Sequence, residues 1–154
     1  MSIINELKAI VRTFEQENID YALCGGLAMA VYNFPRATLD IDLMLQVDSL
    51  IRATNALKTL GFTMDAAPMS FKDGQVQIYR LIKPLHSAGE ILMIDLLIVT
   101  PATSDAWHSR KTVKWEDGIL KIVSPQGLIN LKSLRLSGTD QDDIAHLESI
   151  VNDN

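Results

Sequence analysis

This chain of 154 residues has only one cysteine, no excess of basic residues and no long apolar run. Its one cysteine, Cys24, cannot form an internal disulfide, and a metal site built from several cysteines is excluded. The longest apolar run, residues 91–99, contains Asp95 and is too short for a membrane-spanning helix, which needs about 20 apolar residues. The first residues also lack the basic stretch and apolar core of a signal peptide. We therefore expect a soluble, cytoplasmic protein without a membrane partner.

The charged residues give a net charge of −5, from 14 Lys and Arg against 19 Asp and Glu. Residues 139–154 hold five of the acids and no Lys or Arg, so residues 1–138 carry 14 basic and 14 acidic side chains. Proteins that bind long duplex nucleic acid usually have a basic excess, because neutralisation of phosphates dominates that affinity. We therefore expect no binding to long duplex DNA, although local anion sites are compatible with this balance.

The composition, 47% hydrophobic and 21% charged, is typical of a globular protein. A chain of this length buries enough surface to fold without a structural metal or a disulfide. It shows no internal repeat, low-complexity tract or linker. We therefore expect residues 1–154 to form a single domain.

The spacing of apolar residues predicts alternating helices and strands. Helices are expected at residues 2–18, 27–32, 48–60 and 125–137, with a last helix that follows a break at residues 138–140 and ends near residue 151. Strands are expected at residues 21–24, 39–47, 75–83, 91–99, 112–115 and 118–123. The third and fourth strands should be neighbours, and the last two should form a hairpin. This order predicts an α+β (α/β) fold, in which a mixed β-sheet is flanked by helices and the C-terminal helical pair of residues 125–151 packs on it.

Apolar and polar residues alternate along the strand at residues 39–47. Asp40 and Asp42 fall on one side, because residues two apart on an extended strand point the same way. Two such carboxylates can converge on a hard cation, or they can form the solvent face of an edge strand. The other face is predicted to hold five apolar residues: Leu39, Ile41, Leu43, Leu45 and Val47.

A third acid, Asp95, favours the cation site. Its neighbours in the strand at residues 91–99 are all apolar, which predicts burial on both faces. An ionised carboxylate there is costly unless a cation or hydrogen bonds compensate it, although protonation or a polar contact could also satisfy it. Three carboxylates are typical of a magnesium site, because Mg²⁺ takes oxygen ligands and shares them with substrate phosphates.

Gly25 and Gly26 lie between the strand at residues 21–24 and the helix that follows. Glycine permits a tight turn and the close approach of an anion. A helix N-terminus adds free N–H groups and the positive end of a dipole. On its own, a Gly-Gly pair is better explained by an ordinary turn. Together with the three acids, however, the pair predicts a phosphate site beside a metal site.

These pieces form a known pattern: Cys24-Gly25-Gly26, a helix, the segment Arg36-Ala37-Thr38-Leu39-Asp40-Ile41-Asp42-Leu43 that leads into the next strand, and Asp95 on a later strand. The pattern resembles the signature of the nucleotidyltransferase superfamily with the DNA polymerase β-like core. Its Arg-x-Thr-x-Asp-x-Asp form looks most like the minimal and abortive-infection (AbiE-type) toxin-like members. The C-terminal segment, with Lys132 and with Asp140, Asp142, Asp143 and Ile144, resembles the ending of those proteins.

The resemblance implies a Mg²⁺-dependent enzyme that moves a nucleoside monophosphate from an NTP, such as ATP, to an acceptor hydroxyl by a two-metal mechanism. It implies that the catalytic residues and metal ligands are Asp40, Asp42 and Asp95. It also implies a set of nucleotide-binding residues: Gly25, Gly26, Arg36, Thr38 and Lys132. Many members have serine after or in place of the second glycine, whereas here Leu27 follows Gly26.

The acceptor and the partners are left open by the sequence. The acceptor hydroxyl could belong to a tRNA or another RNA end, to a protein or to a small molecule. Its recognition could come from a partner, such as an antitoxin, or from self-association. The alternative to an enzyme is a non-catalytic interaction module with the nucleotidyltransferase fold, for instance one component of a toxin–antitoxin pair.

Overall fold

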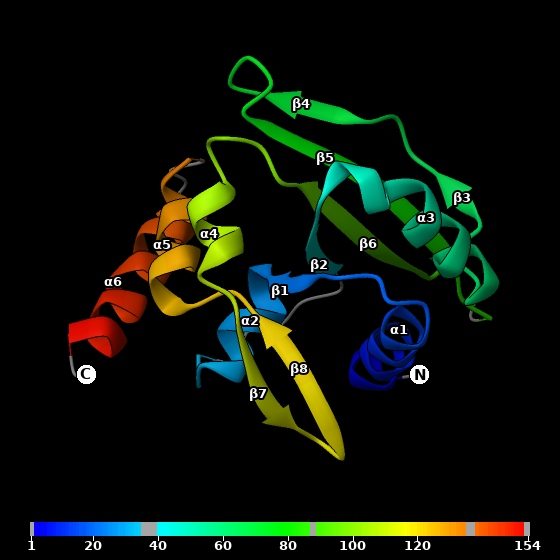
Figure 1. Ribbon diagram of the computed structural model, residues 1–154, viewed down its shortest axis with the longest axis horizontal. Helices are drawn as coiled ribbons and strands as arrows, with labels where there is room; N and C mark the ends of the chain where they lie inside the picture. Colours follow the sequence, from blue (N-terminus) through cyan, green and yellow to red (C-terminus); the bar gives the residue numbers. More distant parts are fainter. Residues whose placement is uncertain (1, 35–39, 87–88, 135–137, 153–154) are drawn as a thin grey trace.

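A mixed β-sheet forms the centre of the computed structural model, which describes residues 2–34, 40–86, 89–134 and 138–152 (Figure 1). The strands are β1 (Ala22–Cys24), β2 (Asp40–Leu45), β3 (Met64–Asp65), β4 (Met69–Phe71), β5 (Val76–Pro84), β6 (Ile91–Ile98), β7 (Lys111–Trp115) and β8 (Gly118–Ile122). Their order is β3-β5-β6-β2-β1-β8-β7, and β4 is a further partner of β5. Two pairs, β2 with β6 and β1 with β8, are parallel, and the other pairs are antiparallel.

The helices lie around this sheet. They are α1 (Ile3–Gln16), α2 (Gly25–Val31), α3 (Leu50–Thr59), α4 (Ser104–His108), α5 (Pro125–Ser133) and α6 (Gly138–Asn152), with a 3₁₀ turn at Val47–Ser49. Figure 1 shows α1 and α3 on one side of β1 and β2, and α4, α5 and α6 gathered on the other. None of the described helices is long and apolar enough to cross a membrane.

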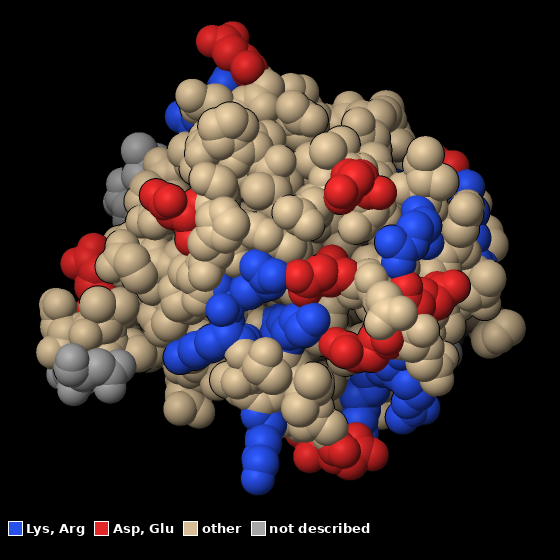
Figure 2. Space-filling model, viewed as in Figure 1, with Lys and Arg blue, Asp and Glu red and all other residues tan. Residues whose placement is uncertain are grey.

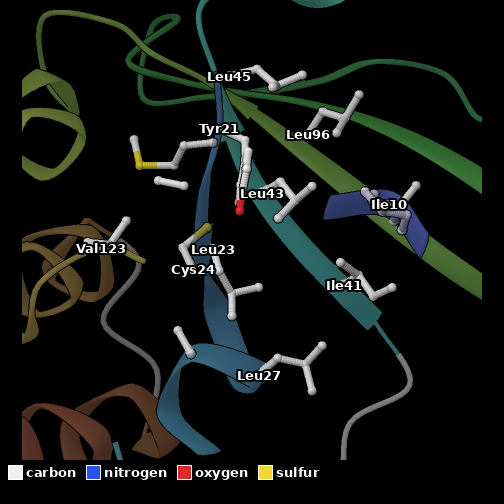
Figure 3. Packing of buried hydrophobic residues seen from close by; sticks show 14 of the residues in the cluster. Ile10, Tyr21, Leu23, Cys24, Leu27, Ile41, Leu43, Leu45, Leu96 and Val123 are labelled. Atoms are coloured by element: carbon white, nitrogen blue, oxygen red, sulfur yellow. The ribbon is translucent and has the colours of Figure 1, made fainter. Parts of the chain in front are cut away.

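The central strands present an apolar face to α1. Ile41 and Leu43 of β2 and Leu96 of β6 are completely buried, and Figure 3 shows them on the same side of the strands as Ile10 of α1. Burial of each such side chain contributes about 1.5–3 kcal/mol. Because side chains alternate along a strand, this packing fixes which residues of β2 point to the opposite face. Those residues are Asp40, Asp42 and the buried Met44.

The predicted mixed sheet flanked by helices is confirmed, as are the neighbouring strands β5 and β6 and the hairpin of β7 and β8. The prediction was wrong at Val47, which is 66% exposed and begins the 3₁₀ turn instead of completing the apolar face of β2. The break expected at residues 138–140 was also wrong, because α6 begins at Gly138. Three short elements were not predicted: β3, β4 and α4.

A buried ion pair joins the two C-terminal helices. Nζ of Lys132 in α5 lies 3.0 Å from Oδ2 of Asp143 in α6, and both residues are buried. Removal of one member of a buried ion pair is strongly destabilising, because the remaining buried charge loses the compensation that this partner gave it. The pair therefore makes the docking of α6 on α5 depend on two particular residues.

We expect Asp143→Ala to lower the free energy of unfolding by about 3–5 kcal/mol, because it leaves the ammonium of Lys132 buried without this partner. Urea unfolding measures the change. Asp142→Ala is the matched control, since Asp142 is adjacent but exposed. A double substitution, Lys132→Met with Asp143→Leu, should destabilise less than Asp143→Ala alone. An equal or greater loss in the double variant would contradict this account of the pair.

Candidate active site

Four polar or reactive side chains form a row across the sheet, on the face opposite Ile41 and Leu43. Asp42 of β2 pairs in register with Cys24 of β1 on one side and with Asp95 of β6 on the other. Asp95 in turn pairs with Arg80 of β5. Residues at paired positions share a face of a sheet. The strand register therefore brings Asp42 and Asp95, which are far apart in sequence, next to each other.

Asp40 lies on the same face as this row. It is two residues before Asp42 and pairs in register with Met93, which is itself two residues before Asp95. Asp40 and Asp42 are partly exposed, whereas Asp95 is only 8% exposed. The predicted burial of Asp95 is thus confirmed. The three acids lie together at the first half of β2 and the middle of β6.

Arg80 compensates the charge of the buried acid. Its Nε donates to Oδ1 of Asp95 at 2.7 Å, and its Nη2 donates to Oδ2 at 2.9 Å. A guanidinium that binds both oxygens of a carboxylate makes the strongest kind of side-chain ion pair. The sequence pattern predicts that a cation or hydrogen bonds compensate Asp95, but it does not identify Arg80 as the partner. The sequence did contain a signal for this partner. If the strands predicted at residues 75–83 and 91–99 form a hairpin, residue 80 pairs with residue 95 or with a residue next to it.

The charges of the site influence one another. Burial, and after it the charge of Asp95, raise the pKa of Asp40 above its ordinary value, although Arg80 opposes this effect. Hydrogen bonding to Asp95 raises the pKa of Arg80, with further contributions from the charges of Asp95, Asp40 and Asp42. Arg80 therefore lies in the field of all three carboxylates.

Gly25 packs directly against Asp42. Its φ is 69°, in the left-handed region that side chains disfavour, and a Cβ at this position would lie 2.6 Å from Cγ of Asp42 and closer still to Oδ2. Both the backbone conformation and the space therefore require glycine here. The predicted glycine turn does lie beside the predicted acids. Gly25 and Gly26 were expected to form a turn before the helix, whereas in the structure they are the first two residues of α2.

The remaining predicted site residues are placed differently. Arg36 and Thr38 lie outside the described residues, as does the side chain of Asp140. Lys132 is buried in α5 with Asp143 as an ion-pair partner, so its predicted part in nucleotide binding stays a prediction.

The far end of α2 is held in place by Tyr32, whose hydroxyl donates to the carbonyl oxygen of Val123 at 2.8 Å.

The donor chemistry of the three acids fits Mg²⁺, because carboxylates supply the hard oxygen ligands that this ion prefers and the three acids share one face of the sheet. Within residues 2–34, 40–86, 89–134 and 138–152, however, no three His, Cys, Asp or Glu side chains converge closely enough to hold an ion. Asp95 is turned toward Arg80. A cation at this site would therefore require carboxylates to reorient.

Basic and acidic atoms are mixed on the face of the molecule shown in Figure 2, where Lys and Arg gather over the region of β7, β8 and α1 with Asp and Glu beside them. Asp20 exemplifies this mixing, since it pairs with both Arg110 and Lys121. Burial raises the pKa of Asp20, but the hydrogen bonds and charges of these two partners outweigh that effect and leave its pKa lowered. This face therefore carries no uniform positive charge.

Comparison with known proteins places the fold. No family model matches the sequence, and no curated protein is similar to it in sequence. Among solved structures, TM1012 of Thermotoga maritima, a proposed nucleotidyltransferase, superposes with a TM-score of 0.61 at 11% identity, over 99% of this chain and 94% of that one. ANT(2″)-Ia, solved in complex with adenylyl-2″-tobramycin, gives a TM-score of 0.63 at 12% identity, over 98% and 90%. JHP933 of Helicobacter pylori gives 0.52 at 19% identity, over 92% and 62%. The chain thus has the fold of nucleotidyltransferase structures.

We expect Gly25→Ala to lower the free energy of unfolding by more than about 2 kcal/mol, because a left-handed backbone costs an L-residue roughly 1–2 kcal/mol and the new Cβ would also displace Asp42. Thermal or urea unfolding measures the loss. Gly89→Ala is the control, since Gly89 has a similar φ of 75° but no atom within 4 Å of the added Cβ. Equal losses in the two variants would show that contact with Asp42 adds nothing.

Proposed function

We propose that this protein is a Mg²⁺-dependent nucleotidyltransferase that moves a nucleoside monophosphate from an NTP to an acceptor hydroxyl. The observation that carries the proposal is the register of β2 and β6, which sets Asp42 beside Asp95 and places Asp40 on the same face. The site lies next to Gly25, in a fold shared with nucleotidyltransferase structures. In such a transfer the acceptor oxygen bonds to the α-phosphorus, the bond from that phosphorus to the bridging oxygen breaks, and pyrophosphate leaves.

Asp40, Asp42 and Asp95 are the proposed catalytic residues and metal ligands. Bound there, Mg²⁺ would activate the acceptor hydroxyl and neutralise the charge of the triphosphate and of the leaving pyrophosphate. The protein's own contribution is positioning: the parallel pairing of β2 with β6 fixes where the backbones of the three acids lie, so that only their side chains have to reorient around a cation. The apolar packing of Ile41 and Leu43 on the opposite face keeps β2 from slipping in register.

The nucleotide's phosphates are proposed to lie at Gly25 and Gly26. At these two positions the chain adds no side chain of its own between the backbone and a phosphate, although the carboxylate of Asp42 already lies at the Cβ position of Gly25. Asp42 packs against Gly25, so phosphates at this turn would be adjacent to the acid cluster. We retain Arg36, Thr38 and Lys132 as proposed nucleotide-binding residues. Of these, Lys132 would first have to exchange its ion pair with Asp143 for a phosphate.

The acceptor is proposed to be the hydroxyl of a tRNA or another RNA end, of a protein or of a small molecule. ANT(2″)-Ia, which has a similar fold, was solved with an adenylylated small molecule. A small-molecule acceptor should therefore be included in any assay of transfer. The Arg36-x-Thr38-x-Asp40-x-Asp42 pattern favours the abortive-infection type, and with it an antitoxin or a second copy of this chain as partner.

Thermal unfolding in the presence of each of the four NTPs, with and without Mg²⁺, tests the proposal. A ligand at about 100 times its Kd stabilises a protein by about 2.7 kcal/mol, which raises the Tm of a domain of this size by several degrees. We expect a shift that requires Mg²⁺ and is absent in Asp42→Asn. Transfer of the α-phosphate label of the stabilising NTP to tRNA, to the protein itself or to an aminoglycoside then identifies the acceptor class.

Asp48→Asn is the matched control, because Asp48 follows β2 in the chain but is exposed in the 3₁₀ turn. It should keep the full shift. A shift that survives in Asp42→Asn would remove the acids from the site. The absence of any shift with every NTP would contradict the enzyme proposal and favour the non-catalytic interaction module.

A further inference from the structure

Arg80 lies on the acid face, and the proposed transfer does not explain its role. It comes from β5, on the far side of Asp95 from Asp42. Both of its donors to Asp95 are well formed, at 2.7 and 2.9 Å, and the side chain of Asp95 is only 11% exposed. The two oxygens that a metal would use are thus already engaged by a cation of the chain itself.

The charge of the site follows from this arrangement. Three ionised carboxylates carry −3, and the guanidinium reduces the total to −2. Arginine keeps its charge at any physiological pH, so the compensation cannot be released as a proton. It can be withdrawn only if the Arg80 side chain moves away from Asp95.

On the basis of the proposed function, we propose that Arg80 is a built-in counter-cation that stabilises the acid cluster without a metal and competes with a divalent cation for Asp95. Two effects produce the competition. Arg80 occupies the lone pairs of Asp95 that face β5, and its positive charge repels a dication bound to the same carboxylate in a poorly screened site. Removal of Arg80 should therefore tighten metal binding while it weakens the metal-free fold.

The competition also links the metal to the nucleotide. A triphosphate brings additional negative charge to the site, which offsets the repulsion between Arg80 and a dication. A cation should consequently bind weakly to the protein alone and more tightly together with an NTP. Arg80 acts here as a positioning residue, through Asp95, and needs no contact with the reacting atoms.

The test uses Mn²⁺ as the probe and needs no catalytic turnover. The Tm of the wild type and of Arg80→Gln is measured in EDTA and in Mn²⁺ without nucleotide, and the Kd for Mn²⁺ is measured by calorimetric titration. We expect Arg80→Gln to have a lower Tm than the wild type in EDTA, a larger rise in Tm on addition of Mn²⁺, and a Kd for Mn²⁺ tighter by about tenfold or more. Adding Asp42→Asn to this variant should abolish the gain, which locates the ion at the acid face.

Lys83→Gln is the matched control. Lys83 is also on β5, and its Nζ binds Oε1 of the buried Glu6 at 2.8 Å, in a pair with similarly low exposure. Glu6 belongs to α1 and not to the acid face. This substitution should therefore lower the Tm by the same amount in EDTA and in Mn²⁺, and should leave the Kd for Mn²⁺ unchanged.

The outcomes separate this inference from the proposed function. Mn²⁺ binding that is equal or weaker in Arg80→Gln than in the wild type overturns the role of Arg80 and leaves the metal site in place. No Mn²⁺ binding by either protein, with or without an NTP, overturns the metal site itself. If Arg80→Gln does not fold even in Mn²⁺, Arg80→Lys takes its place, because lysine keeps the charge but cannot donate to both oxygens of Asp95 in the bidentate geometry of arginine. Its Kd for Mn²⁺ should be tighter than that of the wild type by a smaller factor, and an unchanged Kd overturns the inference.

Discussion

The parallel pairing of β2 with β6 is the constraint on which the rest of the site depends. Its register sets Asp42 opposite Asp95, and the alternation of side chains then puts Asp40 on the same face. A slip of one residue would turn these acids toward α1 and bring apolar side chains to the opposite face. The free energy of apolar burial, which prevents that slip, thus also determines where negative charge accumulates.

The accumulated charge in turn determines what surrounds it. A buried carboxylate such as Asp95 requires a partner, and β5 supplies Arg80 at the paired position. Gly25 leaves room for Asp42 on the other flank. The acids therefore have a cation on one side and a closely packed glycine on the other.

Local patterns in the sequence were enough to predict much of this molecule, and contacts between distant strands account for most of what was missed. Alternation predicted that Asp40 and Asp42 share a face, and an apolar context predicted the burial of Asp95. The identity of its partner, Arg80, depends on a register between strands that periodicity does not contain. The error at Val47 arose because its apolar side chain continues the alternation while the backbone has already entered a 3₁₀ turn. The strands β3 and β4 are short and largely exposed, so they carry no apolar pattern.

The fit between Gly25 and Asp42 has a consequence for the variation of this sequence among its relatives. The positive φ of Gly25 disfavours a side chain whatever its neighbour, but the space at this position is filled by the carboxylate of one other residue. A chain that replaced Asp42 with a smaller residue would gain room at position 25. A chain that kept Asp42 would have to keep glycine at position 25 as well. A side chain at position 25 is therefore expected only in relatives that have lost the acid, where the positive φ is the obstacle that remains.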